Sequence, residues 1–382
     1  MGHGIAQSFA QAGYNVTLVD IKDEFVQGGL EKIKWSLSKF VEKGRLTQPL
    51  MDATLKRIKT STNRAAAVKT ADLVVEAVPE LMDLKREVFA DLDKNAPKHT
   101  ILATNTSSLP ITEIAQGTKR PDKVVGMHFF SPVQMMNLVE IIKGEKTTEE
   151  TAKIIYDLTG KIGKEPVMCY KDVPGFIANG VMMFPLNFVG QLMDTGKFKP
   201  EEIDSAAHFN MGNPMGIFGL LDFVGIDVAY NVLKFMATRI PGMKVAKCLE
   251  DRVKRGDLGV KTGKGFYEYP AKRWQQPTSW SQQIATKFDP QLVVCTAINR
   301  AAALVNDKVA SPADIDKTVK MGFNMPLGML EIADSLGIDE VVKKLEFIAK
   351  QYDKFYAPHP LLLKMVKEGK LGQKSKQGFF KY

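Results

Sequence analysis

The 382-residue chain has few cysteines and no long apolar run, and each shortage excludes a class of protein. Its three cysteines, Cys169, Cys248 and Cys295, are odd in number and widely spaced, which fits neither a disulfide framework nor a zinc site. The apolar stretch 181–188 is broken by Pro185, and it is far shorter than the roughly 18 residues of a membrane span. No basic and then apolar leader is visible ahead of it. We therefore expect a cytoplasmic protein that binds neither a membrane nor a metal ion.

Dense blocks of basic residues are also missing, although the formal net charge is +9. Lysines and arginines are interleaved with acids, as in 22–24 and 85–87, whereas a nucleic-acid surface would concentrate them. The excess charge favours a small polyanion such as a nucleotide or coenzyme A, and not nucleic acid, as the partner. With 45% hydrophobic and 25% charged residues, the composition is that of a globular protein of two or three domains.

The first part of the chain alternates short β-rich runs with amphipathic helical stretches. The expected strands are 15–19, 73–77, 100–103, 124–128, 138–142 and 166–169, and the expected helices are 22–42, 81–94 and 149–162. This alternation is typical of a doubly wound α/β sheet, in which ligands bind outside the carboxyl ends of the strands. We assign the first domain to residues 1–172.

After Asp172 the strand pattern gives way to long helical periods, and one segment occurs twice. Residues 203–216 recur as 315–328, a shift of 112 residues, and the tail 259–269 returns as 372–382, with Gly259 and Gly265 recurring as Gly372 and Gly378. We therefore expect two all-α domains related by an internal repeat, 173–272 and 273–382, with the glycines of the tails in turns. The second copy has Gln291 where the first has Asn179, so we expect it to be structural.

A histidine and a glutamate in neighbouring β-rich runs are the first candidates for catalysis. His128 lies in the run 126–132, and Glu140 follows twelve residues later, directly after an apolar pair. A carboxylate against an imidazole fixes the tautomer and stabilises the imidazolium, which holds a general base near neutral pH. The alternative is a satisfied core histidine and a solvated glutamate at a strand end, and both interpretations stay open at this point.

Small polar residues follow the expected strand 100–103. The run contains Asn105, Thr106, Ser107 and Ser108, and the loops at the carboxyl ends of strands line the ligand crevice of an open parallel sheet. Ser107 is therefore well placed to bind a substrate oxygen. The alternative is that these hydroxyls only make a turn and cap a helix near Pro110.

The amino-terminal residues carry part of a dinucleotide-binding pattern. Gly2 opens a helical run that ends near Gly13, and Asp20 follows the next strand. An acid about 20 residues past a glycine-rich turn binds the ribose hydroxyls of NAD and repels the extra phosphate of NADP. The full pattern has a strand and two glycines ahead of the third glycine, which is the position that Gly2 fills. We therefore expect NAD as the cofactor and a sheet whose first strand is missing from these residues.

Five segments together, in this order and spacing, resemble the L-3-hydroxyacyl-CoA dehydrogenases. They are 1–6, 105–108, 128–132, the glutamate at 140, and 174–179. The resemblance covers essentially the whole chain, and it implies a Rossmann-like NAD-binding domain followed by a helical domain. The doubled helical unit resembles the longer members, in which the second copy takes the place of a partner subunit.

The resemblance also implies roles for individual residues. His128 matches the catalytic base, Glu140 matches its orienting carboxylate, and Ser107 and Asn179 match the groups that hydrogen-bond the reacting oxygen. The positions that match nucleotide contacts are Gly2, Asp20, Glu80, Lys85, Asn105, Ser107, Ser131 and Lys261, and those that match coenzyme A contacts are Ser36 and Lys43. The chain departs from the pattern at Ser131, where many members have asparagine, and at Gly180, where a larger polar residue often stands.

The activity implied is the reversible, NAD-dependent oxidation of an L-3-hydroxyacyl-CoA to the 3-ketoacyl-CoA, with a short chain such as 3-hydroxybutyryl-CoA. Two alternatives stay open: a dehydrogenase of a small free hydroxy acid, and a non-catalytic relative with an incomplete dinucleotide site. A separate enoyl-CoA hydratase is a possible partner, because no hydratase module is visible in the sequence. We expect a monomer or a homodimer.

Overall fold

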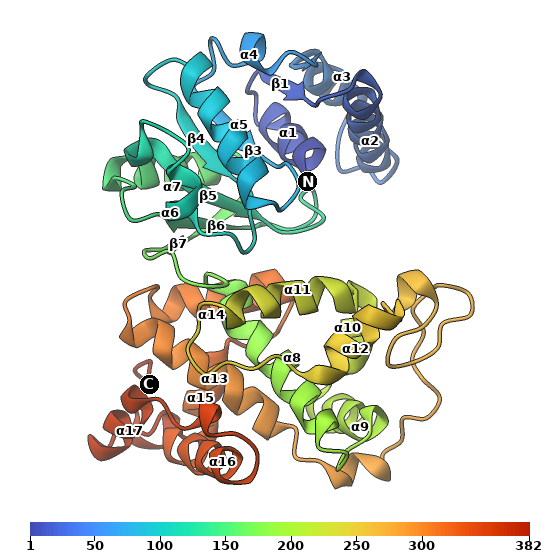
Figure 1. Ribbon diagram of the computed structural model, residues 1–382, viewed down its shortest axis with the longest axis vertical. Helices are drawn as coiled ribbons and strands as arrows, with labels where there is room; N and C mark the ends of the chain where they lie inside the picture. The colour runs from blue at the N-terminus through green and yellow to red at the C-terminus, as the bar shows by residue number, and fades with distance from the viewer. The chain divides into compact units, whose positions relative to one another are not determined.

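A computed structural model describes residues 1–382, and it divides into two compact units. Unit 1 comprises Met1–Phe176 together with Lys320–Met325, and unit 2 comprises Ile177–Val319 together with Pro326–Tyr382. All seven strands belong to unit 1, whereas unit 2 is built of helices (Figure 1). The expected change from an α/β fold to a helical one is therefore confirmed.

The strands of unit 1 form two sheets. The smaller sheet pairs β1 (Val16–Val19) with β2 (Ile58–Ser61) in parallel. The larger sheet has the order β3-β4-β5-β6-β7, with β3 (Leu73–Glu76), β4 (Ile101–Thr104), β5 (Val124–Phe129), β6 (Leu138–Lys143) and β7 (Glu165–Cys169). Its pairs are parallel except β5 with β6, which is antiparallel. β2 was not expected from the sequence, because its only strongly apolar residue is Ile58.

Helices cover both faces of the larger sheet. The helices of unit 1 are α1 (Gly2–Gln11), α2 (Asp23–Glu42), α3 (Gln48–Lys56), α4 (Arg64–Ala67), α5 (Met82–Asn95), α6 (Ile111–Ala115) and α7 (Glu149–Lys161), with the short 3-10 helix η1 (Pro121–Lys123). Phe9 of α1 and Ile155 of α7 pack with Met127 of β5 in one core cluster. Gly126 lies on the opposite face of the sheet, where a Cβ would lie 2.9 Å from Ile111 of α6. Successive residues of a strand point to opposite faces, so His128 shares the face of Gly126.

The two sheets are not hydrogen-bonded to each other. β1 and β3 each pair with a strand on one side only. All four residues of β4 are buried, as expected for a strand inside a parallel sheet. The apolar residues Leu73, Val74 and Val75 of β3 are only half-buried. The edge of the larger sheet at β3 thus has the composition of an interior strand and the exposure of an edge strand.

Unit 2 is built around two long helices, α8 (Ala178–Asp194) and α13 (Gln291–Asn306), which pack against each other. The helices that follow α8 are α9 (Pro200–Met211), α10 (Phe218–Val224), α11 (Ile226–Ala237) and α12 (Lys247–Arg255), and those that follow α13 are α14 (Pro312–Phe323), α15 (Met329–Leu336), α16 (Ile338–Gln351) and α17 (Pro360–Lys367). Four 3-10 turns complete the unit: η2 (Val260–Thr262), η3 (Ile284–Lys287), η4 (Lys354–Tyr356) and η5 (Gln373–Ser375).

Buried aspartates make the same contacts in both halves of this helical region. Asp204 accepts hydrogen bonds from the backbone N–H groups of residues 217–219 at the start of α10. Asp316 does the same for Leu330 and Glu331 at the start of α15. A carboxylate at a helix N-terminus satisfies amides that have no partner within the helix. The sequence repeat thus preserves the residues that begin equivalent helices.

A second pair of aspartates binds the two tails. Asp222 accepts from the amides of Phe266 and Tyr267, and Asp334 accepts from those of residues 379 and 380. The tails require glycine at these positions for different reasons. Gly259 has a φ of +96°, as a turn glycine should, but Gly265 has no positive φ and is needed because a Cβ would lie 2.0 Å from Asp222 Oδ1. Gly265 and its counterpart Gly378, which approaches Asp334 equally closely, both lie in bends, as expected of turn residues. The nearby aspartate, and not a positive φ, is what requires glycine at these two positions.

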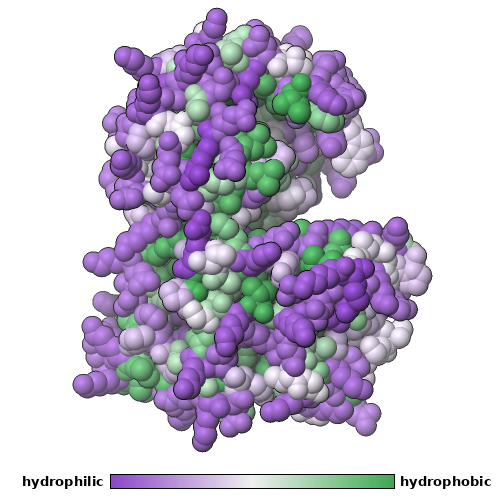
Figure 2. Space-filling model, in the orientation of Figure 1, coloured by the Kyte–Doolittle hydropathy of each residue, from purple (hydrophilic) through white to green (hydrophobic).

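The surface is mostly hydrophilic, with scattered apolar side chains (Figure 2). The most exposed of the large apolar side chains are Ile21 at 77% and Trp35 at 66%. None of the helices combines the length and the apolar content that crossing a bilayer would require.

Candidate active site

His128 and Glu140 are in direct contact. The antiparallel pairing of β5 with β6 places these two residues opposite each other in register. Glu140 Oε2 lies 2.6 Å from His128 Nδ1, and the side chains are 0% and 10% exposed. Because Nδ1 is engaged by the carboxylate, Nε2 is the nitrogen left to exchange a proton with a ligand. The interpretation of Glu140 as a solvated strand-end charge is therefore wrong.

Aromatic rings surround the imidazole. The ring of Phe130 lies 4.8 Å from that of His128, centre to centre, and the ring of Phe176 lies at 6.4 Å. After Phe130 the chain turns through Ser131, which is exposed. Lys164 holds this turn, because its buried ammonium donates to the carbonyl oxygens of Val133 and Met136 at 2.6 and 2.8 Å. Burial lowers the pKa of Lys164. No pattern in the sequence indicates this role for a lysine that follows a helix.

The loop after β4 is tied to the strand that carries His128. Asn105 Oδ1 accepts a hydrogen bond from the backbone N–H of Phe129 at 2.9 Å, and its own N–H donates to the carbonyl of Glu76. This loop continues into Ser107, whose side chain is half-buried. The polar run after β4 therefore lies beside the end of β5.

Glu80 organises the same loop. Its Oε1 accepts from the hydroxyl of Thr106, from the backbone N–H of Ser107 at 3.1 Å, and from both the N–H and the hydroxyl of Ser108. Burial by itself would raise the pKa of Glu80, but the ammonium of Lys85 and these hydrogen bonds hold it below its ordinary value. The hydroxyls of the loop thus do more than cap a helix.

Lys85 lies between two carboxylates and is almost fully buried. Its ammonium is 2.8 Å from Glu76 Oε1 and 3.3 Å from Glu80 Oε2, and the side chain is 1% exposed. Glu76 also accepts from the hydroxyl of Thr104 at 2.7 Å. Glu76 is a site residue that was not expected from the sequence. The signal was present, since a glutamate that ends an otherwise apolar strand needs a buried partner.

The residues expected to bind the nucleotide at the amino end lie at strand and helix ends. Asp20 is exposed directly after β1, and its carboxylate accepts from the next backbone N–H at 2.7 Å. Gly2 opens α1, where a Cβ would come within 3.9 Å of Ala77, just past β3. The first amides of a helix attract phosphate. An exposed carboxylate for ribose hydroxyls and a helix N-terminus for a pyrophosphate thus fit NAD chemically.

The remaining expected site residues are more scattered. Ser36 is buried within α2, and Lys43 is exposed directly after this helix. In unit 2, Asn179 lies half-buried in the first turn of α8. Lys261 forms an ion pair of 2.5 Å with Asp227, and the repeat places Lys374 and Asp339 in the same arrangement.

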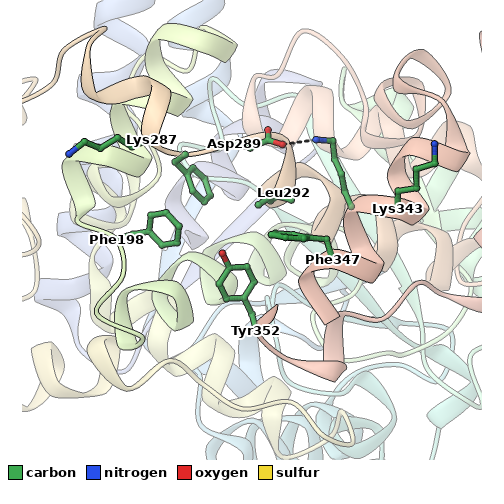
Figure 3. A pocket seen from close by; sticks show the side chains of 9 residues that line it. Phe198, Lys287, Asp289, Leu292, Lys343, Phe347 and Tyr352 are labelled. Carbon is green, nitrogen blue, oxygen red and sulfur yellow. Dashed lines mark hydrogen bonds and ion pairs between the residues drawn. The ribbon is translucent and has the colours of Figure 1, made fainter. Parts of the chain in front are cut away.

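A hollow of about 440 Å³ in unit 2 is separate from all of these residues. It is lined by Phe198, Lys287, Phe288, Asp289, Leu292, Lys343, Lys344, Phe347 and Tyr352 (Figure 3). Its lysines are paired with acids, as the contact of Lys344 with Asp289 at 2.5 Å shows. No expected site residue lines this hollow, so it adds nothing to the candidate active site.

Family models match both parts of the chain. The NAD-binding domain of 3-hydroxyacyl-CoA dehydrogenase matches residues 1–173, and the C-terminal domain of 3-hydroxyacyl-CoA dehydrogenase matches residues 175–269 and 291–382. Together with the Rossmann-like sheet and the buried histidine–glutamate pair, these matches show that the chain belongs to the 3-hydroxyacyl-CoA dehydrogenase family.

Individual relatives agree with this assignment. A probable 3-hydroxybutyryl-CoA dehydrogenase of Bacillus subtilis is 42% identical over 274 residues, which are 71% of this chain and 95% of the relative. The mitochondrial hydroxyacyl-coenzyme A dehydrogenase of Rattus norvegicus is 42% identical over 277 residues, which are 70% of this chain and 88% of the relative. The solved structure of 3-hydroxybutyryl-CoA dehydrogenase from Escherichia coli superposes with a TM-score of 0.88 at 28% identity, covering 97% of each chain.

Proposed function

We propose that this protein catalyses the reversible, NAD-dependent oxidation of short-chain L-3-hydroxyacyl-CoA, such as 3-hydroxybutyryl-CoA, to the 3-ketoacyl-CoA. The observation that carries the proposal is the buried contact of 2.6 Å between His128 Nδ1 and Glu140 Oε2. Family membership and the names of the Bacillus subtilis and Escherichia coli relatives support the choice of substrate.

His128 acts as the general base on the 3-hydroxyl. With a proton on Nδ1 donated to Glu140, the lone pair of Nε2 is free to take the hydroxyl proton. Glu140 stabilises the imidazolium that results, because its charge is buried and in contact with the ring. In the reverse direction the same imidazolium returns the proton to the ketone oxygen.

Ser107 and Asn179 hold the reacting oxygen by hydrogen bonds. The fixed loop between β4 and α6 supports this role for Ser107, since Glu80 binds the backbone of residues 107 and 108. Bound NAD supplies the acceptor for the hydride that leaves C3. The protein's own contribution is therefore orientation and proton transfer.

The binding roles of the other residues follow from their positions and the family match. Asp20 binds the ribose hydroxyls, and the amides that Gly2 begins bind the pyrophosphate. Further nucleotide contacts come from Glu80, Asn105, Ser107, Ser131 and Lys261, with Lys85 acting through Glu80, and coenzyme A is bound by Ser36 and Lys43. Because Lys85 is buried between two glutamates, its share is to fix Glu80 and thereby the loop.

The helical region consists of two copies of one domain, 173–272 and 273–382, after an NAD-binding domain of residues 1–172. The double match of the C-terminal family model and the repeated aspartate contacts support this division. An additional parallel strand fits between β1 and β3 and would join the two sheets. The half-buried apolar residues of β3 support it, since that edge is suited to a strand neighbour.

The cysteines and the substrate class indicate the cellular setting of the protein. Three unpaired cysteines support a reducing compartment such as the cytoplasm. A separate enoyl-CoA hydratase is a suitable partner, because hydration of an enoyl-CoA yields a 3-hydroxyacyl-CoA. The protein acts as a monomer or a homodimer.

Replacing the proposed base tests the function directly. His128→Gln should lower the turnover of acetoacetyl-CoA with NADH by at least about 10²-fold, since a positioned base contributes about 10²–10⁴ in rate. NADH binding, measured by fluorescence titration, should stay unchanged. Wild-type turnover in this variant would reject the mechanism, and equal activity on free acetoacetate would reject the acyl-CoA substrate.

The chain offers a matched control for this substitution. His99 Nε2 lies 3.1 Å from Asp72 Oδ1, but the two side chains are 62% and 94% exposed. His99→Gln therefore removes an imidazole–carboxylate contact at the surface, and turnover should remain at the wild-type rate.

A further inference from the structure

The end of α14 belongs to the same compact unit as the sheet that carries His128. Residues 320–325 group with unit 1, although they lie far along the chain in the second helical copy. The ring of Phe323 meets the ring of Phe130 edge-on, with centres 6.5 Å apart. Phe130 in turn lies 4.8 Å from the ring of His128. Two successive aromatic contacts thus connect α14 to the proposed base.

Gly322 makes the close approach of these rings possible. A Cβ on this glycine would lie 3.0 Å from Phe130 Cε1 and 3.3 Å from Leu138 Cδ2, which is tighter than ordinary side-chain contact. Glycine weakens a helix, so its presence in α14 needs a reason. A cap is not the reason, because the left-handed residue that follows α14 is Asn324, with a φ of 52°. The contacts show instead that glycine at position 322 leaves space for the Phe130 ring.

The first copy has different residues at the equivalent positions. The shift of 112 residues aligns Gly322 with Asn210 and Phe323 with Met211, and α9 and α14 have bounds that differ by the same shift. Met211 is 43% exposed, and Asn210 is exposed as well. The glycine and phenylalanine are therefore not a requirement of the repeated fold, because the first copy forms the same helix without them.

We propose that Phe323 is a positioning residue for His128. Through the space that Gly322 leaves, Phe323 holds the Phe130 ring against the imidazole and restricts the orientations in which Nε2 can face the substrate. The second helical copy then takes part in catalysis and is not only structural. This inference rests on the proposed function, because it assigns a purpose to the orientation of the proposed base.

The test combines a spectroscopic signal with turnover. The chain has 5 histidines, so the imidazole Cε1–H resonance of His128 can be assigned by its loss in His128→Gln. In Phe323→Ala and in Gly322→Asn, which introduces the residue of the first copy, we expect this resonance to shift because the neighbouring ring moves. The kcat for acetoacetyl-CoA should fall at least about tenfold, since small misplacements of reacting groups are costly, while the KM for NADH stays the same. Phe323→Leu, which keeps most of the bulk, should recover both readouts.

The control is Met211→Ala at the equivalent exposed position, which should leave the resonance and the kcat unchanged. A folded Phe323→Ala protein with an unchanged kcat would overturn the proposal, whether or not the resonance moves. A fall in kcat with an unmoved resonance would also overturn it, because the effect would not pass through His128. If the wild-type protein has no turnover but the resonance still shifts in Phe323→Ala, the proposed function is contradicted, and the influence of Phe323 on His128 through Phe130 is supported.

Discussion

At the scale of single residues, the charged groups inside unit 1 are buried only where they have partners. Glu140 is 0% exposed and meets the ring of His128, and Lys85 is 1% exposed and meets Glu76 and Glu80. Burying a charge without a partner costs far more than any single contact returns. The same chemistry that makes these residues candidates for function therefore also makes them important for stability.

Removing the buried lysine is expected to be costly. In Lys85→Met, Glu76 and Glu80 lose the ammonium between them, and the free energy of unfolding should fall by about 3–5 kcal/mol. Urea denaturation measures this loss. The control is Lys153→Met, which removes an exposed i,i+4 ion pair with Asp157 and should cost below about 1 kcal/mol. Similar losses in the two variants would show that the buried pair does not stabilise the fold.

At the scale of secondary-structure elements, the direction of β6 decides the active site. In an antiparallel pair, residues on adjacent strands lie directly opposite each other, and His128 and Glu140 share one face of the sheet. The helical region depends instead on the ends of its helices. Asp204 in α9 and Asp316 in α14 each bind the first amides of the next helix, α10 and α15 respectively.

The buried aspartate before α10 should make stability depend on pH. Burial raises the pKa of Asp204 to about 7, against the backbone amides and the Tyr267 hydroxyl that favour its anion. The carboxyl therefore holds its proton more tightly in the folded state than in the unfolded one, where aspartate titrates near a pKa of about 3.9. The stabilisation of the folded state that comes from this tighter proton binding is present in full below about pH 4 and is lost as the pH rises to about 7.

This dependence can be isolated by substitution. Asp204→Asn cannot ionise, so the difference in unfolding free energy between wild type and variant should shrink as the pH rises from 4 to 7, by an amount on the order of a few kcal/mol. Urea denaturation at several pH values measures it. Parallel pH curves for the two proteins would show that Asp204 keeps its charge throughout this range.

At the scale of the whole molecule, two sheets stand where a doubly wound domain usually has one. β1 and β3 each lack a strand neighbour on one side, and a dinucleotide lies across the strand ends of such a sheet. We expect a chain extended at its amino end by one apolar, glycine-ended strand to bind NADH at least about tenfold more tightly, or by about 1.4 kcal/mol. Fluorescence titration compares it with the 382-residue chain. An equally long Gly/Ser extension is the control, and equal affinities of all three would argue against the strand.

The sequence by itself determined which residues carry chemistry and how the chain is organised. The alternation of strands and helices, the repeat at a shift of 112 residues, and the run of polar residues around Ser107 are local patterns. Local patterns reflect propensity and periodicity, which each segment carries with it. For that reason six of the seven strands and the change to an all-helical region were predictable.

Only the tertiary structure decided which of these residues meet. The contact of His128 with Glu140 depends on the antiparallel register, the burial of Lys85 depends on Glu76 at the end of another element, and Phe323 reaches Phe130 across almost 200 positions of sequence. Such contacts arise from the packing of elements that are distant along the chain. No segment encodes them alone, because the free energy that fixes them comes from burying both partners together.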